Sequence, residues 1–185
     1  MLKQYFEQVV SAINSIDRKE LNRLIDALFV LRGNNGRLFV LGVGGSAANA
    51  SHAVNDFRKL CGIDAVAPDN IAELTAWAND EGWRHSLTGF LQHLNIRDAL
   101  FVLSVGGGTP NVSAPLVEAI VNAKDLHCKV FGIVGHRGGI TAEYGNHVIR
   151  IPLVNEIHVT PHTEAFQAVV WHALVSHPLL QKRKT

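Results

Sequence analysis

The chain has few cysteines, little net charge and no long apolar run. Among its 185 residues only Cys61 and Cys128 are cysteines; they lie far apart and form no CxxC pair, so we expect reduced thiols and a cytoplasmic protein. A formal net charge of +1 argues against a nucleic acid partner. No apolar run approaches the roughly 20 residues of a membrane span, and no signal peptide is apparent, so we expect no membrane attachment.

What the sequence does have is a regular alternation of short apolar runs and helical periodicity, which predicts one α/β domain over residues 1–185. Apolar runs predict about five strands, at Arg37–Leu41, Gly62–Val66, Ala99–Ser104, Lys129–Val134 and Val148–Ile151. Three- and four-residue apolar spacing predicts helices over Ser46–Leu60, Ile71–Ala78, Trp83–Leu94, the segment ending at Ala123, and Thr160–Ser176 with Thr160 as N-cap. The alternation is typical of a parallel sheet with helices on both faces.

An amphipathic helical segment, 1–32, precedes the first predicted strand. Its spacing breaks near Ser15–Asp17, where Asp17 is suited to cap a second helix. We expect this segment to lie outside the core sheet and to pack against another subunit.

Two predicted strands end in glycine-rich turns that carry hydroxyl groups. The first turn contains Gly44, Gly45 and Ser46, and the second runs from Ser104 through Gly106 to Thr109. One such turn is better explained as a tight connection, but two beside helix starts favour a phosphate or a phosphosugar. No Walker lysine follows either turn and GxGxxG is absent, which argues against nucleoside triphosphates and dinucleotides.

Acidic and imidazole side chains recur at helical spacing on two distant helices. His52 and Asp56 are four residues apart, and Glu164 and His172 are eight apart, so each pair lies near one face of its helix. These four residues are suitable ligands for zinc or another divalent ion, although a surface contact explains the first pair equally well. Asn79-Asp80 is compatible with a simple turn between helices.

These motifs together resemble the sugar isomerase (SIS) domain family, and within it the bacterial phosphoheptose isomerases. The resemblance rests on Gly44-Gly45-Ser46 followed by His52 and Asp56, on Asn79-Asp80-Glu81-Gly82, on the loop Ser104–Val112, and on the pair Glu164 and His172. It implies a flavodoxin-like three-layer sandwich with an N-terminal helical extension, assembled as a homotetramer with active sites at subunit interfaces.

The resemblance also implies a reaction and roles for particular residues. The reaction is an aldose–ketose isomerisation through an enediol, with sedoheptulose 7-phosphate as the expected substrate and D-glycero-D-manno-heptose 7-phosphate as the product. Asp56 corresponds to the general base and His172 to its acid/base partner. Substrate contacts fall on Gly44, Gly45, Ser46, Asn79, Asp80, Ser104, Gly106 and Thr109, and zinc ligands fall on His52, Asp56, Glu164 and His172.

The chain departs from the family pattern at several of these positions. Val43 replaces an asparagine, Asp56 replaces a longer glutamate, and Glu164 replaces a glutamine. The second loop reads Ser104-Val105-Gly106 and has two hydroxyls fewer than the family loop. Two other functions therefore remain open: a non-catalytic regulator resembling the replication-initiator-associating protein, and an enzyme acting on a different sugar phosphate, by isomerisation or a lyase-type step.

Overall fold

The computed structural model describes residues 1–182; residues 183–185 of the predicted domain lie outside this range. Its five strands are all parallel and form one sheet in the order β2-β1-β3-β4-β5. They are β1 Arg37–Leu41, β2 Asp64–Val66, β3 Ala99–Ser104, β4 Lys129–Gly135 and β5 His147–Ile151. This is the strand order of the flavodoxin-like doubly wound fold, so the predicted fold class is confirmed.

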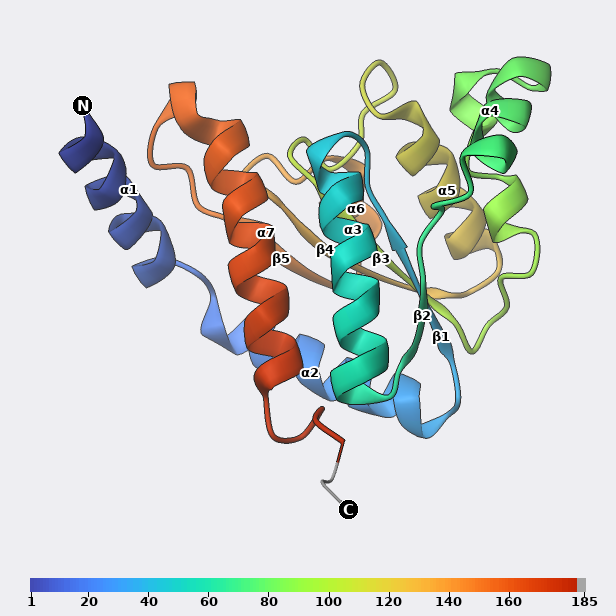
Figure 1. Cartoon of the computed structure of the whole chain (residues 1–185), viewed down its shortest axis with the longest axis horizontal. Helices are drawn as coiled ribbons and strands as arrows, with labels where there is room; N and C mark the ends of the chain where they lie inside the picture. Colours follow the sequence, from blue (N-terminus) through green and yellow to red (C-terminus); the bar gives the residue numbers. More distant parts are fainter. Residues whose placement is uncertain (183–185) are drawn as a thin grey trace.

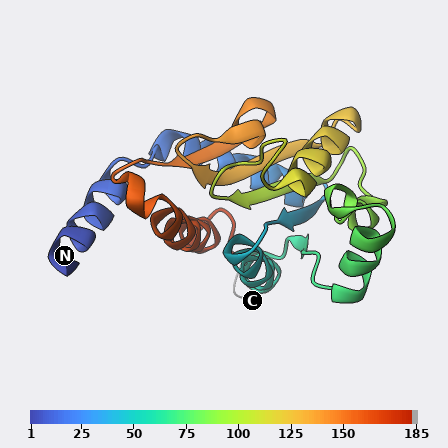
Figure 2. The ribbon, with the colours of Figure 1, turned by 90° about the horizontal axis from the view of Figure 1, so that it is seen from above.

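Helices cover both faces of the sheet and divide the core into two layers (Figure 2). On one face, α3 (Gly45–Asp56) and α7 (Val159–Ser176) bury Phe57, Trp171 and other large side chains against β1, β3 and β4. On the other face, α5 (Ala114–Asp125) packs with α6 (Gly139–Tyr144), and Leu116 joins the second layer. Central strands that are buried on both faces explain why their sequences are continuous apolar runs rather than alternating ones.

The structure corrects two of the predicted helices. Instead of one helix over Trp83–Leu94 there are two short 3₁₀ turns, Trp83–His85 and Gly89–Leu91, after Gly82 at a φ of +86°. Leu87, Leu91 and Leu94, in and around these turns, are buried at four- and three-residue intervals that imitate helical spacing. The last helix begins at Val159 rather than at a Thr160 cap, because a 3₁₀ turn, Glu156–His158, capped by the Asn155 side chain, precedes it.

The helix after the first glycine turn changes pitch at Asp56. Residues Phe57–Cys61 form a π-helical turn, which ends at Gly62 with a φ of +66°. The predicted strand at Gly62–Val66 therefore starts only at Asp64. π-Helical turns are rare and occur frequently at functional sites, which draws attention to the residue just before this one.

The N-terminal segment consists of two helices with different environments. The helix α2 (Arg18–Gly33) is capped by Asp17, whose carboxylate accepts the backbone N–H groups of Lys19 and Glu20 at 2.9 and 3.0 Å. These two bonds hold the pKa of Asp17 below its ordinary value. Contrary to expectation, α2 belongs to the core, where it buries Leu24, Ile25, Leu28 and Leu31.

The first helix, α1 (Leu2–Asn14), lies at the periphery of the molecule beside the start of α7 (Figure 1). It exposes an apolar row at three- and four-residue spacing: Leu2, Phe6, Val10 and Ile13. This apolar row of α1 is a candidate for the subunit contact that was predicted for residues 1–32.

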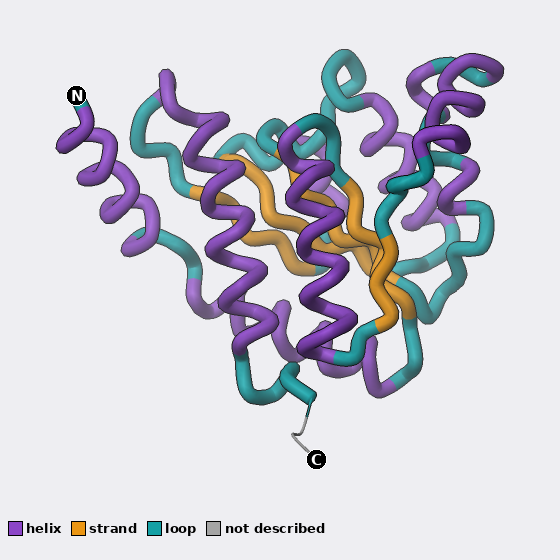
Figure 3. Tube along the Cα trace, in the orientation of Figure 1, coloured by secondary structure: helices purple, strands orange, loops and turns teal. Residues whose placement is uncertain are grey.

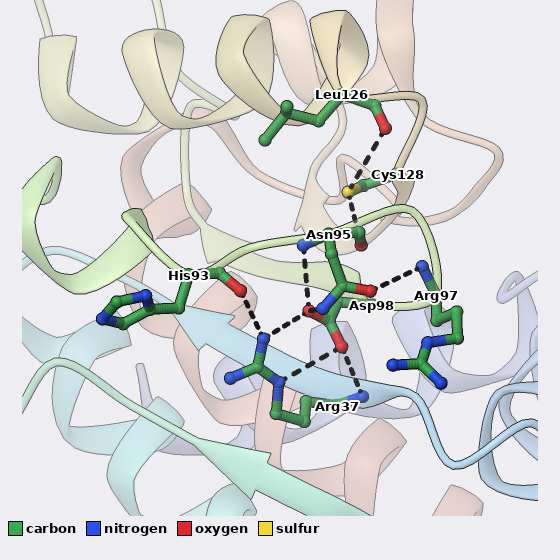
Figure 4. Close-up of polar contacts among 7 residues, drawn as sticks. All are labelled: Arg37, His93, Asn95, Arg97, Asp98, Leu126 and Cys128. Carbon is green, nitrogen blue, oxygen red and sulfur yellow. Dashed lines mark hydrogen bonds and ion pairs between the residues drawn. The ribbon is translucent and has the colours of Figure 1, made fainter.

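A buried ion pair ties the amino end of the sheet together (Figure 4). The Asp98 carboxylate is 2% exposed; Arg37 donates its backbone N–H and its guanidinium to it, with the shortest bond at 2.7 Å. Asn95 donates both its backbone and side-chain N–H to the same carboxylate. With this many donors the buried charge is fully compensated, and the network fixes the loop that leads into β3.

Both thiols are structural. Cys61 and Cys128 are buried and free, and burial raises the pKa of each to about 11, so they stay protonated at neutral pH. Within residues 1–182, no helix combines the length and the apolar character that crossing a membrane requires.

A cluster of aromatic and amide side chains fastens α1 to α7. The Gln8 side-chain oxygen lies 2.8 Å from His158 Nδ1 and 3.0 Å from His162 Nε2, and the Tyr5 ring stacks on His162. His162 is 2% exposed, and its other nitrogen, Nδ1, has no hydrogen-bond partner among the described residues. Burial, and then the neighbouring His158, lower the pKa of His162.

This lowered pKa predicts a loss of stability in mild acid. Because His162 binds a proton less readily in the folded chain than in the unfolded chain, its contribution is complete above the unfolded pKa of about 6.5 and is lost as the pH falls below it. We expect the free energy of unfolding of the protein to decrease from pH 7.5 to pH 5, and the variant His162→Gln to show a shallower decrease. Urea unfolding between pH 7.5 and pH 5 measures the free energy of unfolding of both proteins. The exposed His93, changed to Gln, is the control, and an unchanged slope in His162→Gln contradicts the assignment.

Candidate active site

The two helices that carry the predicted metal ligands, α3 and α7, lie side by side (Figure 1). Both start near the carboxyl edge of the sheet. There, Asn49 donates to the backbone oxygen of Glu164 at 3.0 Å and to the Gln167 side chain at 2.8 Å. Gln167 in turn donates to the Ser46 hydroxyl at 3.0 Å. These buried bonds set the register of the two helices and so decide which residues meet further along them.

At the far end of this helix pair, His52, Asp56 and His172 come together. The Asp56 Oδ2 atom lies 3.6 Å from His52 Nε2 and 3.4 Å from His172 Nε2, and all three atoms lie within 4.8 Å of one another. Asp56 is nearly buried, whereas the two imidazoles are 58% and 50% exposed. We call these three residues the His–Asp–His cluster. Two helices that are distant in sequence thus bring two imidazoles and a carboxylate to one exposed position.

The geometry of this cluster suits a divalent ion. Ligand atoms about 2.0–2.1 Å from a tetrahedral zinc ion are roughly 3.3–3.4 Å apart, close to the two separations measured from Asp56. Nitrogen and carboxylate oxygen are ligands that zinc accepts, and the exposed side leaves room for water or substrate. With an ion bound, the three residues would be its protein ligands, as in open catalytic zinc sites.

Glu164 does not take part in this cluster within one chain. Its carboxylate lies against Gly45 at the start of α3, so close that a Cβ on Gly45 would be 2.6 Å from Glu164 Oε1. Eight residues of helix place it about 12 Å along α7 from His172. The expectation that Glu164 joins His52, Asp56 and His172 is therefore not met inside the chain. The negative carboxylate instead interacts with the positive end of the α3 dipole.

The first glycine turn is occupied by side chains from α7 rather than open to a phosphate. Gly44 adopts a φ of +63° and starts α3, and Ser46 is 2% exposed with its hydroxyl bound by Gln167. The cavity at this turn holds about 120 Å³ and is lined largely by apolar groups such as Leu74 and Leu87. Sites for small molecules usually enclose about 300–1,000 Å³, so this cavity does not accommodate a sugar phosphate on its own.

The second glycine loop follows β3 at the same edge of the sheet (Figure 3), and its Gly106 and Thr109 are exposed. The Ser104 hydroxyl accepts the Gly107 N–H at 3.0 Å, and Thr109 pairs with Val112 across a narrow turn. A side chain at Gly106 would meet nothing within 4 Å, so the backbone there is accessible. Of the two predicted phosphate turns, this loop has the accessible backbone that an anion needs.

The remaining predicted substrate residues, Asn79 and Asp80, are exposed at the end of α4 (Ile71–Asp80) and bond to each other at 2.7 Å. In Figures 1 and 2, α4 lies on the other side of α3 from α7, so these residues are not near the His–Asp–His cluster of the same chain. Within one chain, then, the cluster, the second loop and Asn79-Asp80 occupy separate places.

Sequence reasoning missed one residue of the cluster's surroundings, Trp171. Its indole Nε1–H donates to Asp56 Oδ2 at 3.2 Å, and its ring lies against both imidazoles. A tryptophan in a helix reads as a core residue, and this one is indeed 1% exposed. The available signal was its position directly before His172.

Comparison with known proteins places this chain in a family. The family model described as SIS domain matches residues 3–135, more than half of the chain. The phosphoheptose isomerase of Geotalea daltonii is 27% identical over 96% of this chain and 91% of its own length, and that of Bordetella avium is 30% identical over 84% and 77%. The structure of a phosphoheptose isomerase from Francisella tularensis superposes with a TM-score of 0.82 at 22% identity, covering 94% of both chains.

Proposed function

The chain belongs to the SIS domain family, and from this membership we propose that it is an aldose–ketose isomerase of sugar phosphates, with sedoheptulose 7-phosphate as substrate. Relatives named phosphoheptose isomerase align over nearly the whole chain, beyond the end of the family match and through α7. The observation that carries the proposal is the convergence of Asp56 with His52 and His172 on an exposed helix face. A carboxylate beside imidazoles is what proton transfer between adjacent carbons requires.

Asp56 is the base and His172 its partner in this proposal. Asp56 takes a proton from C1 of the ketose, and the same proton, or one from water, is returned to C2 of the enediol. His172 donates a proton to the oxygen on C2 and removes one from the oxygen on C1. The carbonyl thereby moves from C2 to C1 with no net gain or loss of electrons. The Asp56 Oδ1 atom accepts a hydrogen bond from the Asn55 amide at 3.3 Å and none from any other group within residues 1–182, and it is the oxygen that accepts the carbon-bound proton in this proposal.

A divalent ion, for which we propose zinc, would be held by His52, Asp56 and His172 and would polarise the substrate carbonyl. The phosphate is bound by the second glycine loop, at Ser104, Gly106 and Thr109. We retain Gly44, Gly45 and Ser46, together with Asn79 and Asp80, as residues that contact the sugar. Glu164 lies apart from these three residues within one chain, so its predicted role as a ligand stays a prediction.

The site is completed by a second copy of the chain, in a homo-oligomer for which we propose a tetramer. Three observations support this. The His–Asp–His cluster and the predicted sugar contacts are apart in one chain, the cavity at the first turn is small, and α1 exposes an apolar face. The free thiols Cys61 and Cys128 suit the reducing cytoplasm that we propose as its location.

The test is direct. Purified protein is incubated with sedoheptulose 7-phosphate, with and without added zinc, and formation of the aldose is followed; sedoheptulose without phosphate is the control. We expect turnover only of the phosphorylated sugar. Absence of turnover with every C5–C7 phosphoketose would reject the isomerase, and recovery of a defined protein partner in the same preparation would then favour the regulator.

A further inference from the structure

The indole of Trp171 contacts every member of the His–Asp–His cluster. Its Nε1–H donates to Asp56 at 3.2 Å, its ring meets the His52 ring edge-on with centroids 5.4 Å apart, and it lies tilted against His172 at 4.9 Å. The indole therefore forms the inner wall of the cluster.

The hydrogen bond is made to one particular oxygen. Asp56 Oδ2 accepts from Trp171, and the same atom faces His52 Nε2 and His172 Nε2 at 3.6 and 3.4 Å. A carboxylate oxygen has two lone pairs. The indole N–H engages one lone pair of Oδ2. The second lone pair remains free to bind an ion between the two imidazoles.

The donor is held rigidly, because Trp171 is 1% exposed and packed in the core beneath α7. An indole has only two side-chain torsions, so its N–H stays in place at little further cost in entropy. Asp56, by contrast, has a short side chain whose carboxylate is free to turn about its last bond. The indole removes this freedom before any ion or substrate arrives.

We propose that Trp171 is a positioning residue, which fixes Asp56 Oδ2 so that the His–Asp–His cluster is preorganised for a divalent ion. The kinetic consequence of this role rests on the proposed function, whereas the role in ion binding rests on the geometry of the cluster alone. Hydrogen bonds to metal-binding side chains typically change metal affinity by 10- to 100-fold. Loss of the indole donor is therefore expected to weaken ion binding at a site whose three protein ligands are all retained.

The experiment compares Trp171→Phe, which keeps an aromatic ring but has no N–H, with Trp83→Phe, whose parent side chain is 52% exposed on a 3₁₀ turn. Co²⁺ and Zn²⁺ are titrated into each metal-free protein against a chromophoric chelator. We expect Trp171→Phe to bind both ions about tenfold more weakly than the wild type and Trp83→Phe to be unchanged. Equal affinity in a folded Trp171→Phe variant, or no ion binding by the wild type, would overturn the proposal.

A second measurement tests the proposal without the Trp171→Phe variant, in case that variant does not fold. The chain has three tryptophans, so ¹⁵N-tryptophan labelling yields three indole signals, which Trp77→Phe and Trp83→Phe assign by elimination. The Trp171 signal should be that of a hydrogen-bonded, slowly exchanging N–H both without and with Zn²⁺. A solvent-exchanging indole, or one released by Zn²⁺, contradicts the proposed bond.

Kinetics separate this inference from the proposed function. Because Trp171 is not placed against substrate, Trp171→Phe should lower kcat at limiting zinc, regain it as the zinc concentration is raised, and leave KM for the sugar phosphate unchanged. If the wild type turns over and Trp171→Phe matches it in both kcat and ion affinity, only the positioning role is wrong. If the wild type does not turn over, the isomerase proposal is wrong, and the ion titration still decides the role of Trp171.

Discussion

Replacing Asp56 by asparagine should lower kcat/KM for sedoheptulose 7-phosphate by about 10³-fold, the loss expected when a general base is removed and a charged ligand is made neutral. The amide has nearly the same shape as the carboxylate and still accepts a hydrogen bond from Trp171 through its oxygen. The fold should therefore be preserved, and the loss should appear mainly in kcat. Steady-state kinetics together with far-ultraviolet circular dichroism measure both.

Asp69→Asn is the matched control, since Asp69 is exposed in the loop before α4 and the chemical change is the same. It should leave kcat/KM unaltered. If Asp56→Asn retained more than a tenth of the wild-type activity, Asp56 would not be the base, and the isomerisation would need another carboxylate.

Replacing Gly107 by alanine should disrupt the second glycine loop and destabilise the protein by about 3 kcal/mol or more. Gly107 has a φ of +72°, and a Cβ there would lie 1.8 Å from the backbone oxygen of Gly138. The Gly107 backbone is held in place by two hydrogen bonds. Its carbonyl oxygen accepts one from the Thr141 hydroxyl at 2.7 Å and one from the Thr141 backbone N–H at 3.0 Å. Neither the conformation nor the clash can be relieved locally.

Thermal unfolding measures this effect. A loss of 3 kcal/mol corresponds to a decrease in Tm of about 6–12 °C for a chain of this size. Gly106→Ala, one residue away, is the control, because its Cβ meets nothing within 4 Å and its φ is not positive. It should keep the wild-type Tm while raising KM for the phosphorylated sugar. Similar Tm values for the two variants would contradict the role given to Gly107.

The strands were predictable because burial on both faces leaves continuous apolar runs that glycine terminates. Arg37–Leu41 and Ala99–Ser104 have the same bounds in the sequence and in the structure. The predicted helix over Trp83–Leu94 was wrong, because Leu87, Leu91 and Leu94 are buried at four- and three-residue intervals without forming a continuous helix. Apolar spacing indicates which side chains are buried in the core, and a series of 3₁₀ turns can bury side chains at the same spacing as an α-helix.

Helical spacing likewise predicted part of the candidate site. One turn separates His52 from Asp56, which lets both reach one point, and this pair meets His172 as expected. Glu164 does not lie with them in one chain, because spacing places residues around a helix but does not shorten the rise of two turns along it. The partners that set the register of α3 against α7, such as Asn49 and Gln167, depend on tertiary contacts that no local pattern contains.

The position of Glu164 over the start of α3 has a practical consequence. A fixed carboxylate at this helix terminus supplies the negative charge that would otherwise be drawn from solution, so free phosphate or sulfate gains little by binding there. Competitive inhibition by these buffer anions would then report on the loop after β3 alone. An inhibition constant for inorganic phosphate becomes a direct measure of how much of the substrate's affinity that single loop provides.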